Sequence, residues 1–361
     1  MGTHSGAPYF RFARRFLLSA SVIDARPEEL GHPPLLRLPL ATLYLTERCN
    51  SRCVTCDYWR HGRSDMSLQD VQRLMPALLQ LQTEVVLLSG GEPLMNPDWA
   101  AIAGLLASAG IKSWLLTSGL SLAKHARRAC ELLDAITVSL DGADPSTYQA
   151  IRGLDAFDTV CDGIKAAAAL GVAPGVRVTV QRANYRQLPE LVSLVKQLGA
   201  RQVSFLAVDV ANPHAFGRTE SFGTDLALGV EDLGELDSIL TQMETSHAAE
   251  FRSGFIAESP GKLRRLHQYF AAIQGRATFP KVRCNAPEYS AVIGATGQVH
   301  PCFFISGPSH AKLGDGDLYG VLNGGDMGAL RAAIRDNGRA ECKTCVCSLW
   351  RDTDNIGSSL L

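Results

Sequence analysis

The chain has 361 residues, which is enough for two or three domain-sized units with a substantial core. Hydrophobic residues make up 46% and charged residues 20%, values that exclude wholesale disorder. The net charge of −1 gives no basic field for nucleic acid or an anionic membrane. The chain has ten cysteines, which is too few for a scaffold of this length held together by disulfides. It is also more cysteine than a cytosolic enzyme usually contains. We therefore expect reduced thiols or metal ligands.

Residues 1–38 form a lead-in segment in which a short apolar patch, 16–23, follows three arginines. The patch is shorter than a signal-peptide core and lacks a clear small-residue cleavage site. No run of about 20 apolar residues, the length of a membrane span, occurs in the sequence. We expect a basic amphipathic helix that packs on the domain, with peripheral membrane contact as the alternative and the cytoplasm as the location.

Residues 39–212 alternate short apolar runs with amphipathic stretches. This rhythm predicts a parallel α/β sheet with right-handed crossovers, either doubly wound or a partial or full barrel. Both architectures place their chemistry at the carboxyl ends of the strands. The predicted strands are 41–46, 84–89, 112–117, 135–140, 175–181 and 202–208, and the predicted helices are 68–81, 99–109, 121–133, 157–170 and 188–198.

Beyond residue 212 the rhythm stops. Residues 213–280 read as a helical connector with helices near 230–245 and 261–273. Residues 281–361 form a unit rich in glycine and cysteine, whose clearest element is a hairpin around 291–304.

Cys49, Cys53 and Cys56 follow the first predicted strand with the spacing C-x3-C-x2-C. A buried helix face is a poor explanation, because polar residues are interleaved with the thiols. A zinc site would need a fourth ligand, for which His61 is the only local candidate. Three thiolates on one tight loop instead suit three corners of a cubane iron–sulfur cluster whose fourth iron stays open for a substrate.

This spacing at the end of the first strand resembles the signature of the radical S-adenosylmethionine (SAM) superfamily. The resemblance implies a partial (β/α)6 TIM-type barrel, a SAM-binding [4Fe-4S] cluster held by Cys49, Cys53 and Cys56, and cleavage of SAM to a 5′-deoxyadenosyl radical. The second strand ends in Gly90, Gly91, Glu92 and Pro93, which resembles the family's GGEP motif. Glycines permit close approach, and a carboxylate can accept hydrogen bonds from the SAM ammonium group.

Polar residues near the later strand ends are further candidates for SAM binding, by analogy with the family. A guanidinium, for example, suits a carboxylate. For each of them the alternative is a polar loop residue or a helix cap. They are Ser118, Ser139, Asp141, Arg152, Gln181 and Asn184.

A second set of cysteines lies in the last 78 residues, with a C-x12-G-x4-C stretch followed by C-x2-C. It resembles the shorter, twitch-type form of the SPASM/twitch extension. The resemblance implies one auxiliary [4Fe-4S] cluster ligated by Cys284, Cys302, Cys342 and Cys345; structural zinc is the alternative. Cys347 is then surplus: it is either the fourth ligand in place of Cys345, a buried thiol, or a hydrogen-atom donor to a substrate radical.

The family resemblance leaves the net reaction open. We expect oxidation or epimerisation of a small polar substrate such as a sugar or aminocyclitol, with a flavodoxin- or ferredoxin-type electron donor. Modification of a ribosomally made peptide is one alternative, although residues 1–38 are too few for the recognition domain that such enzymes commonly carry. The family's molybdopterin-precursor cyclase ends in two glycines where this chain ends in GSSLL, so we do not expect that activity. An iron–sulfur electron-transfer or scaffold protein is the alternative of another class.

Overall fold

The computed structural model describes residues 33–60, 62–213, 215–218, 224–314, 317–336, 338–347 and 349–351. Most of the predicted lead-in helix falls on residues 1–32 and lies outside the described residues. Within the described ranges, no helix is both long enough and apolar enough to cross a membrane.

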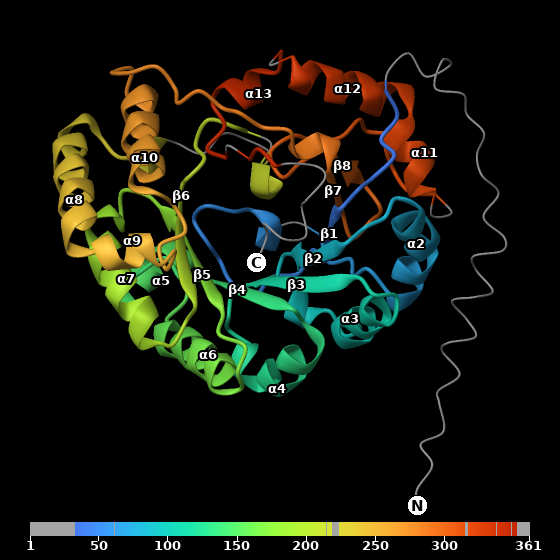
Figure 1. Ribbon diagram of the computed structural model, residues 1–361, viewed down its shortest axis with the longest axis horizontal. Coiled ribbons are helices and arrows are strands. Elements are labelled where there is room, and N and C mark those ends of the chain that lie inside the picture. Colours follow the sequence, from blue (N-terminus) through green and yellow to red (C-terminus); the bar gives the residue numbers. More distant parts are fainter. Residues whose placement is uncertain are drawn as a thin grey trace, which may run out of the picture.

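Six parallel strands form a curved sheet in chain order, as predicted. Each pairs with the next, from Leu40 opposite Val85 at one end to Val180 opposite Ala207 at the other. The sheet curves into an open, TIM-type barrel, and Figure 1 shows its strands in the middle with the helices arranged around them. The strands are β1 (Leu40–Thr46), β2 (Val85–Gly90), β3 (Lys112–Thr117), β4 (Ala135–Ser139), β5 (Gly175–Val180) and β6 (Gln202–Ala207).

Helices cover the outer face of this sheet (Figure 1). The first of them begins at a capping box, in which Ser67 Oγ accepts the Asp70 N–H and the Asp70 carboxylate accepts the Ser67 N–H. All five helices predicted between the strands are present. They are α2 (Leu68–Gln80), α3 (Trp99–Ser108), α4 (Leu122–Leu132), α6 (Phe157–Ala169) and α7 (Leu188–Gln197).

The two faces of the strands differ in chemistry because successive side chains point to opposite sides. On β1, Ala41, Leu43 and Leu45 are fully buried in the hydrophobic core, as the alternate positions of the other strands are. The opposite, inner face carries hydroxyl and charged groups. Among them are Thr42, Tyr44, Ser89, Thr137, Ser139, Arg177, Thr179 and Ser204.

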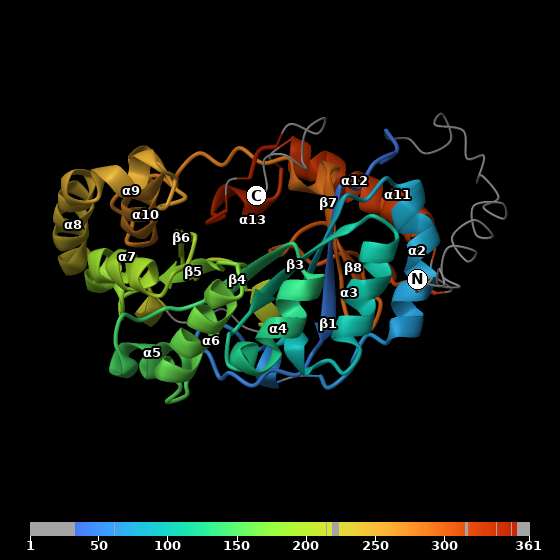
Figure 2. The ribbon, with the colours of Figure 1, turned by 60° about the horizontal axis from the view of Figure 1, so that its bottom comes forward.

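The connector after β6 is helical. Its helices are α8 (Leu233–Ser246), α9 (Ala248–Arg252) and α10 (Pro260–Ile273), so both helices expected there are present. Figure 2 shows them grouped beyond α7 at one end of the molecule.

The C-terminal residues are built onto the barrel through strand pairing. The predicted hairpin consists of β7 (Ser290–Ile293) and β8 (Val299–His300), and β7 pairs in parallel with β1. The described sheet therefore has eight strands in the order β6-β5-β4-β3-β2-β1-β7-β8. In Figure 1 the orange-to-red residues cross the side of the barrel between β6 and β1.

Five of the described helices were not predicted from the sequence: α5 (Pro145–Arg152), which lies between β4 and α6, the short α9 of the connector, and three that follow the hairpin. Those three are α11 (Leu318–Asn323), α12 (Gly325–Arg335) and α13 (Ala340–Lys343).

Asn96 ties the turn after β2 to the neighbouring chain. It is 1% exposed, and its Nδ2 donates to the carbonyls of Leu45 at 2.6 Å and Met66 at 2.8 Å. Removing the amide leaves buried carbonyl oxygens short of donors, so Asn96→Ala is expected to destabilise the fold by about 2 kcal/mol. Urea unfolding followed by circular dichroism measures the change. The matched control Ser108→Ala loses an exposed side-chain hydrogen bond and should stay within about 0.5 kcal/mol; an equal effect of both substitutions would contradict the role of Asn96.

Candidate functional site

The first three cysteines lie on the loop that follows β1, and each sulfur accepts a hydrogen bond. Cys49 Sγ accepts the Ser51 N–H at 3.4 Å, and Cys56 Sγ accepts the Tyr58 N–H. Cys53 Sγ accepts a guanidinium N–H from the side chain of Arg152 at 3.4 Å. Burial raises the pKa of Cys49 to about 11 and the pKa of Cys56 to about 12. A metal bound here would therefore displace protons as it binds.

The C-terminal end of α5 holds this cysteine loop from one side. The backbone N–H of Arg52 donates to the Arg152 carbonyl and that of Val54 donates to the Ile151 carbonyl, both at 3.0 Å. Gly153 ends the helix with φ of 71°, and a Cβ there would lie 2.5 Å from the Arg52 carbonyl oxygen. Only glycine allows the helix end to come so near the loop.

The glycine-rich turn after β2 holds the loop from the other side. The Gly91 N–H donates to the Thr46 carbonyl and the Glu92 N–H donates to the Arg48 carbonyl, both at 2.8 Å. A Cβ at Gly91 would lie 2.1 Å from the Arg48 carbonyl oxygen, which leaves no room for a side chain. The GGEP turn and the cysteine loop thus touch through their backbones, and Pro93, the last residue of the motif, is also buried.

Glu92 is fully buried and is held by hydrogen bonds within the chain. Its carboxylate accepts the Thr117 hydroxyl at 2.8 Å, the Ser118 N–H at 2.7 Å and the Leu94 N–H at 3.1 Å. Burial raises the pKa of Glu92, and the bonds from Ser118 and Thr117 oppose that rise. The Ser118 hydroxyl also donates to Asn50 on the cysteine loop at 3.1 Å. Glu92 and Ser118 are therefore brought together with the loop.

Asp141 and Arg152 form a buried ion pair beside Cys53. Arg152 Nη2 lies 2.8 Å from Asp141 Oδ2, and the other Asp141 oxygen accepts the Thr179 N–H at 2.6 Å. Burial works against the charged form of Arg152, but Asp141 and Cys53 outweigh it and raise the pKa of Arg152. Burial raises the pKa of Asp141, and Arg152 counters part of that rise.

Three further candidates lie near the ends of β4 and β5. The Asn184 amide is fully buried and occupied within the chain, since it donates to the Asp141 and Thr179 carbonyls and accepts the Gln181 N–H. Gln181 is 1% exposed, and its side-chain nitrogen has no hydrogen-bond partner among the described residues. Ser139 is half-buried on the inner face of β4. Gln181 is thus a buried member of this group with unused capacity for a ligand.

The second set of cysteines shows the same sulfur chemistry as the first. Cys284 Sγ accepts the Ala286 N–H at 3.4 Å, and Cys345 Sγ accepts the Cys347 N–H at 3.3 Å. Cys302 Sγ accepts the backbone N–H groups of residues 304 and 305. Burial raises the pKa of Cys302 to about 12 and that of Cys342 to about 11, and the nearby Cys284 adds to both. Burial also raises the pKa of Cys347, again with Cys284 adding to the effect. All five thiols therefore gather at one place.

The remaining two cysteines behave differently. Cys161 is 4% exposed in the core on α6, and Cys130 packs against the same core, as small apolar residues do. The Cys130 thiol donates to the Ala167 carbonyl at 3.9 Å rather than accepting an N–H.

Aromatic residues that the sequence did not single out connect the two cysteine sets. The Tyr44 ring lies 5.5 Å from the ring of Tyr58, which follows Cys56, and 6.4 Å from the ring of Phe303, which follows Cys302. A second pair, Phe216 and Phe304, has ring centroids 5.5 Å apart. The only sequence signal for Tyr44 was its inward position in the alternation of β1.

Arg218 adds a polar connection that was also missed. Its guanidinium donates to the Asn212 carbonyl at 3.0 Å and, at 3.4 Å, to the carbonyl of Thr55 on the cysteine loop. The Asn212 amide in turn donates to the Phe304 carbonyl beside Cys302. The segment after β6 thus joins both cysteine sets, which no local sequence pattern predicts.

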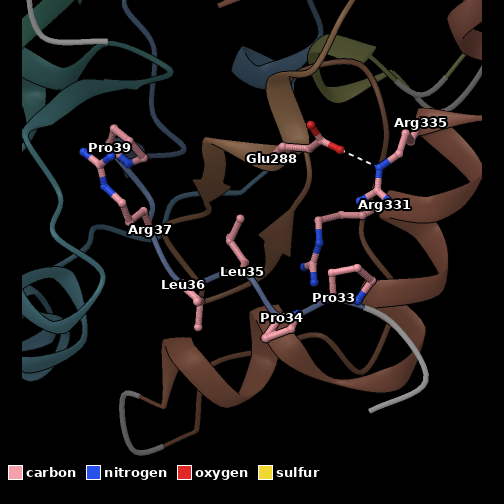
Figure 3. Close-up of a pocket in the computed structure, with 9 residues that line it drawn as sticks. All are labelled: Pro33, Pro34, Leu35, Leu36, Arg37, Pro39, Glu288, Arg331 and Arg335. Atoms are coloured by element: carbon pink, nitrogen blue, oxygen red, sulfur yellow. Dashed lines mark hydrogen bonds and ion pairs between the residues drawn. The ribbon is translucent and has the colours of Figure 1, made fainter. Parts of the chain in front are cut away.

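A cavity of about 280 Å³ lies elsewhere, between the chain that leads into β1 and the helix α12 (Figure 3). Arg335 and Glu288 on its wall form an ion pair at 2.6 Å. None of the candidate residues predicted from the sequence lines it.

The donor chemistry of the two sets fits iron–sulfur clusters. Backbone N–H groups aimed at cysteine sulfurs favour thiolate ligands and are a means of tuning such clusters. As the side chains stand, no three His, Cys, Asp or Glu groups in the described residues are arranged around a single metal ion. The fit therefore rests on the sulfur hydrogen bonds and on the number of thiols at each place.

Comparisons with known proteins agree with this site. The family model of the radical SAM superfamily matches residues 43–205. A probable GTP 3′,8-cyclase of Methanopyrus kandleri is 31% identical over 212 residues, which is 57% of this chain and 66% of the relative. One of Methanococcus maripaludis is 30% identical over 166 residues, which is 44% of this chain and 55% of the relative. The chain thus spans little more than half the length of several of these relatives.

Solved structures show the same fold. Streptococcus suis SuiB bound to S-adenosylmethionine superimposes with a TM-score of 0.65 and 17% identity, covering 97% of this chain and 80% of that one. The anSMEcpe structure with bound AdoMet and the Cp18Cys peptide gives a TM-score of 0.59 and 16% identity, covering 81% of each chain. A likeness that covers 97% of this chain reaches beyond the six-stranded barrel. With its cysteine loop, its GGEP turn and this barrel, the chain belongs to the radical SAM superfamily, whose cofactors are SAM and a [4Fe-4S] cluster.

Proposed function

We propose that Cys49, Cys53 and Cys56 hold the SAM-binding cluster and that the second cysteine set holds an auxiliary [4Fe-4S] cluster. One observation carries the proposal: in both sets, a cysteine sulfur accepts a hydrogen bond from the backbone N–H of the residue two positions later. This bond occurs at Cys49 and Cys56 in the first set and at Cys284, Cys302 and Cys345 in the second. The helical thiol of Cys130 lacks such a bond. We assign the auxiliary cluster to Cys284, Cys302, Cys342 and Cys345.

When bound, the first cluster supplies the electron that cleaves SAM to methionine and a 5′-deoxyadenosyl radical. The chain's own part is to hold the loop and the cofactor in fixed positions. The backbones of Gly90 and Gly91 bring the turn against the loop, and Glu92 is braced to receive the SAM ammonium group. Gln181 has an unpartnered amide nitrogen, which suits an oxygen acceptor on the cofactor.

Arg152 and Ser139 complete the proposed SAM site. The guanidinium is oriented by Asp141 and Cys53 through its two Nη atoms, and its Nε–H, which has no partner among the described residues, remains for a SAM carboxylate. Asn184 acts through Asp141 and Thr179, because its own amide is occupied.

Four protein ligands would leave no open iron at the second set. A site of this kind is suited to accept the electron that a substrate radical gives up when it is oxidised, rather than to bind the substrate. Cys345 is the fourth ligand in this proposal, since its sulfur accepts an N–H from two residues onward as the sulfurs of Cys284 and Cys302 do. Cys347 lies beside the set, where its thiol can serve as a hydrogen-atom donor.

The substrate proposed is a small polar molecule, such as a sugar or aminocyclitol, that is oxidised or epimerised. The hydroxyl and guanidinium groups on the inner faces of β1, β4 and β5 support this, since hydroxylated and amino compounds are recognised by hydrogen bonds. A ribosomal peptide is the second candidate, because the chain shares its fold with SuiB, a structure of which is bound to precursor peptide SuiA. A flavodoxin- or ferredoxin-type protein is the proposed electron donor.

Replacing Cys49, Cys53 and Cys56 together by alanine should remove about four iron atoms per chain and abolish 5′-deoxyadenosine formation. The test uses anaerobically reconstituted protein with SAM and dithionite, with chromatographic detection of the product. Cys130→Ala is the matched control and should keep both iron and activity. Wild-type protein that binds the cluster yet never cleaves SAM would support the electron-transfer alternative instead.

Cys284→Ala should lose about four of about eight iron atoms, yet keep uncoupled cleavage of SAM, because the first cysteine set is intact. Iron, sulfide and zinc analysis measures the content. Cys347→Ser is the control and should retain all the iron, since Cys345 is the proposed ligand. About four iron atoms plus one zinc in the wild-type protein would overturn the auxiliary cluster.

Gly91→Ala should weaken SAM binding by tenfold or more, because a Cβ 2.1 Å from the Arg48 carbonyl oxygen pushes the turn away from the cysteine loop. Binding of SAM to the reconstituted protein is measured by calorimetry. Gly104→Ala on α3 meets no atom within 4 Å and serves as the control. Equal affinities of the two variants would contradict the proposed backbone contact.

A further inference from the structure

One guanidinium touches both a proposed cluster ligand and a buried acid. Arg152 Nη1 donates to Cys53 Sγ at 3.4 Å, while Nη2 lies 2.8 Å from Asp141 Oδ2. Among the described residues, the other two thiols of the first set, Cys49 and Cys56, form hydrogen bonds with backbone groups. Cys53 is therefore the thiol of this loop whose sulfur meets a positive charge directly.

The pair is shielded from solvent. The side chain of Arg152 is 11% exposed and that of Asp141 is 1% exposed, so salt and water screen their charges only weakly. Backbone contacts fix both partners: the Arg152 carbonyl accepts the Arg52 N–H, and the Thr179 N–H donates to Asp141. The guanidinium is therefore held beside the sulfur by its ion pair with an Asp141 carboxylate that the β5 backbone itself anchors.

We propose that Arg152 raises the reduction potential of the cluster held by Cys53 and that Asp141, acting through Arg152, limits that rise. The inference rests on the proposed assignment of Cys53 as a cluster ligand. Asp141 is a positioning residue here, because it touches the guanidinium and not the sulfur.

The sign follows from charge. Reduction adds one electron to the cluster and therefore one negative charge, with no bond made or broken in the protein. A guanidinium hydrogen-bonded to a ligand sulfur stabilises that added charge and favours the reduced form. A carboxylate beside the guanidinium offsets part of the positive field, so its removal favours the reduced form further. The two residues thus act on the potential in opposite directions.

The experiment is a potentiometric titration followed by the electron paramagnetic resonance signal of the reduced cluster, without SAM. The background is Cys284→Ala with Cys302→Ala, so that the first cysteine set alone gives the signal. We expect Arg152→Gln to lower the potential and Asp141→Asn to raise it. Each should shift the ratio of reduced to oxidised cluster by about tenfold at a fixed ambient potential, which is about 59 mV for a one-electron couple.

Two further variants control for charge and for damage. Arg152→Lys keeps the charge without the fork and should shift the potential less than Arg152→Gln does. Arg37→Gln removes an arginine that pairs with Glu84 at 3.0 Å, and neither partner belongs to the cysteine loop. It should leave the potential unchanged.

Opposite shifts in the two single variants support the inference. Unchanged potentials overturn it, and so do shifts in the same direction, which would indicate a loosened loop. If Arg152→Gln fails to assemble a cluster, Asp141→Asn still decides, because it retains Arg152 and predicts a rise. Failure of the cluster assignment is distinguishable, since it would appear as wild-type iron content in the variant lacking Cys49, Cys53 and Cys56.

Discussion

The structure depends on one constraint, the close packing of the backbone on both sides of the loop that follows β1. On one side Gly91 approaches the Arg48 carbonyl, and on the other Gly153 approaches that of Arg52, and neither position has room for a Cβ. Because backbone rather than flexible side chains makes these contacts, the irregular loop that carries the three thiols is fixed from both sides. Reactive groups placed this rigidly need little rearrangement when a cofactor binds.

The two cysteine sets differ in how they are supported. The first is held by the barrel itself, through the β2 turn and α5. The second is carried by three stretches of chain, before β7, after β8 and after α12, and it meets the barrel through β7 and through the Tyr44 and Phe303 rings. Tyr44, on the inner face of β1, lies near both sets through the rings of Tyr58 and Phe303. The inner strand faces, rich in hydroxyls, are where differences of substrate among related proteins would be encoded.

Much of the barrel was readable from the sequence, because buried parallel strands are apolar runs and their helices have a clear period. The six strands and five helices followed from these local signals. The helix α5 did not, since its eight residues bury only Tyr148 and Ile151, too few to show a period. The pairing of β7 with β1 and the contact of Arg152 with Cys53 join residues far apart in sequence, so no local pattern carries them. The GGEP and cysteine motifs were visible because each is contiguous.

The position of β1 has a consequence for biogenesis. This strand, nearly the first element of the described chain, is flanked by β2 on one side and, on the other, by β7, about 250 residues later. During synthesis its second edge stays unpaired until β7 has emerged, and such an edge invites wrong pairing. Folding of the barrel is thus completed from its C-terminal unit, so truncations that spare every residue of the first cysteine loop would still leave an exposed strand beside it.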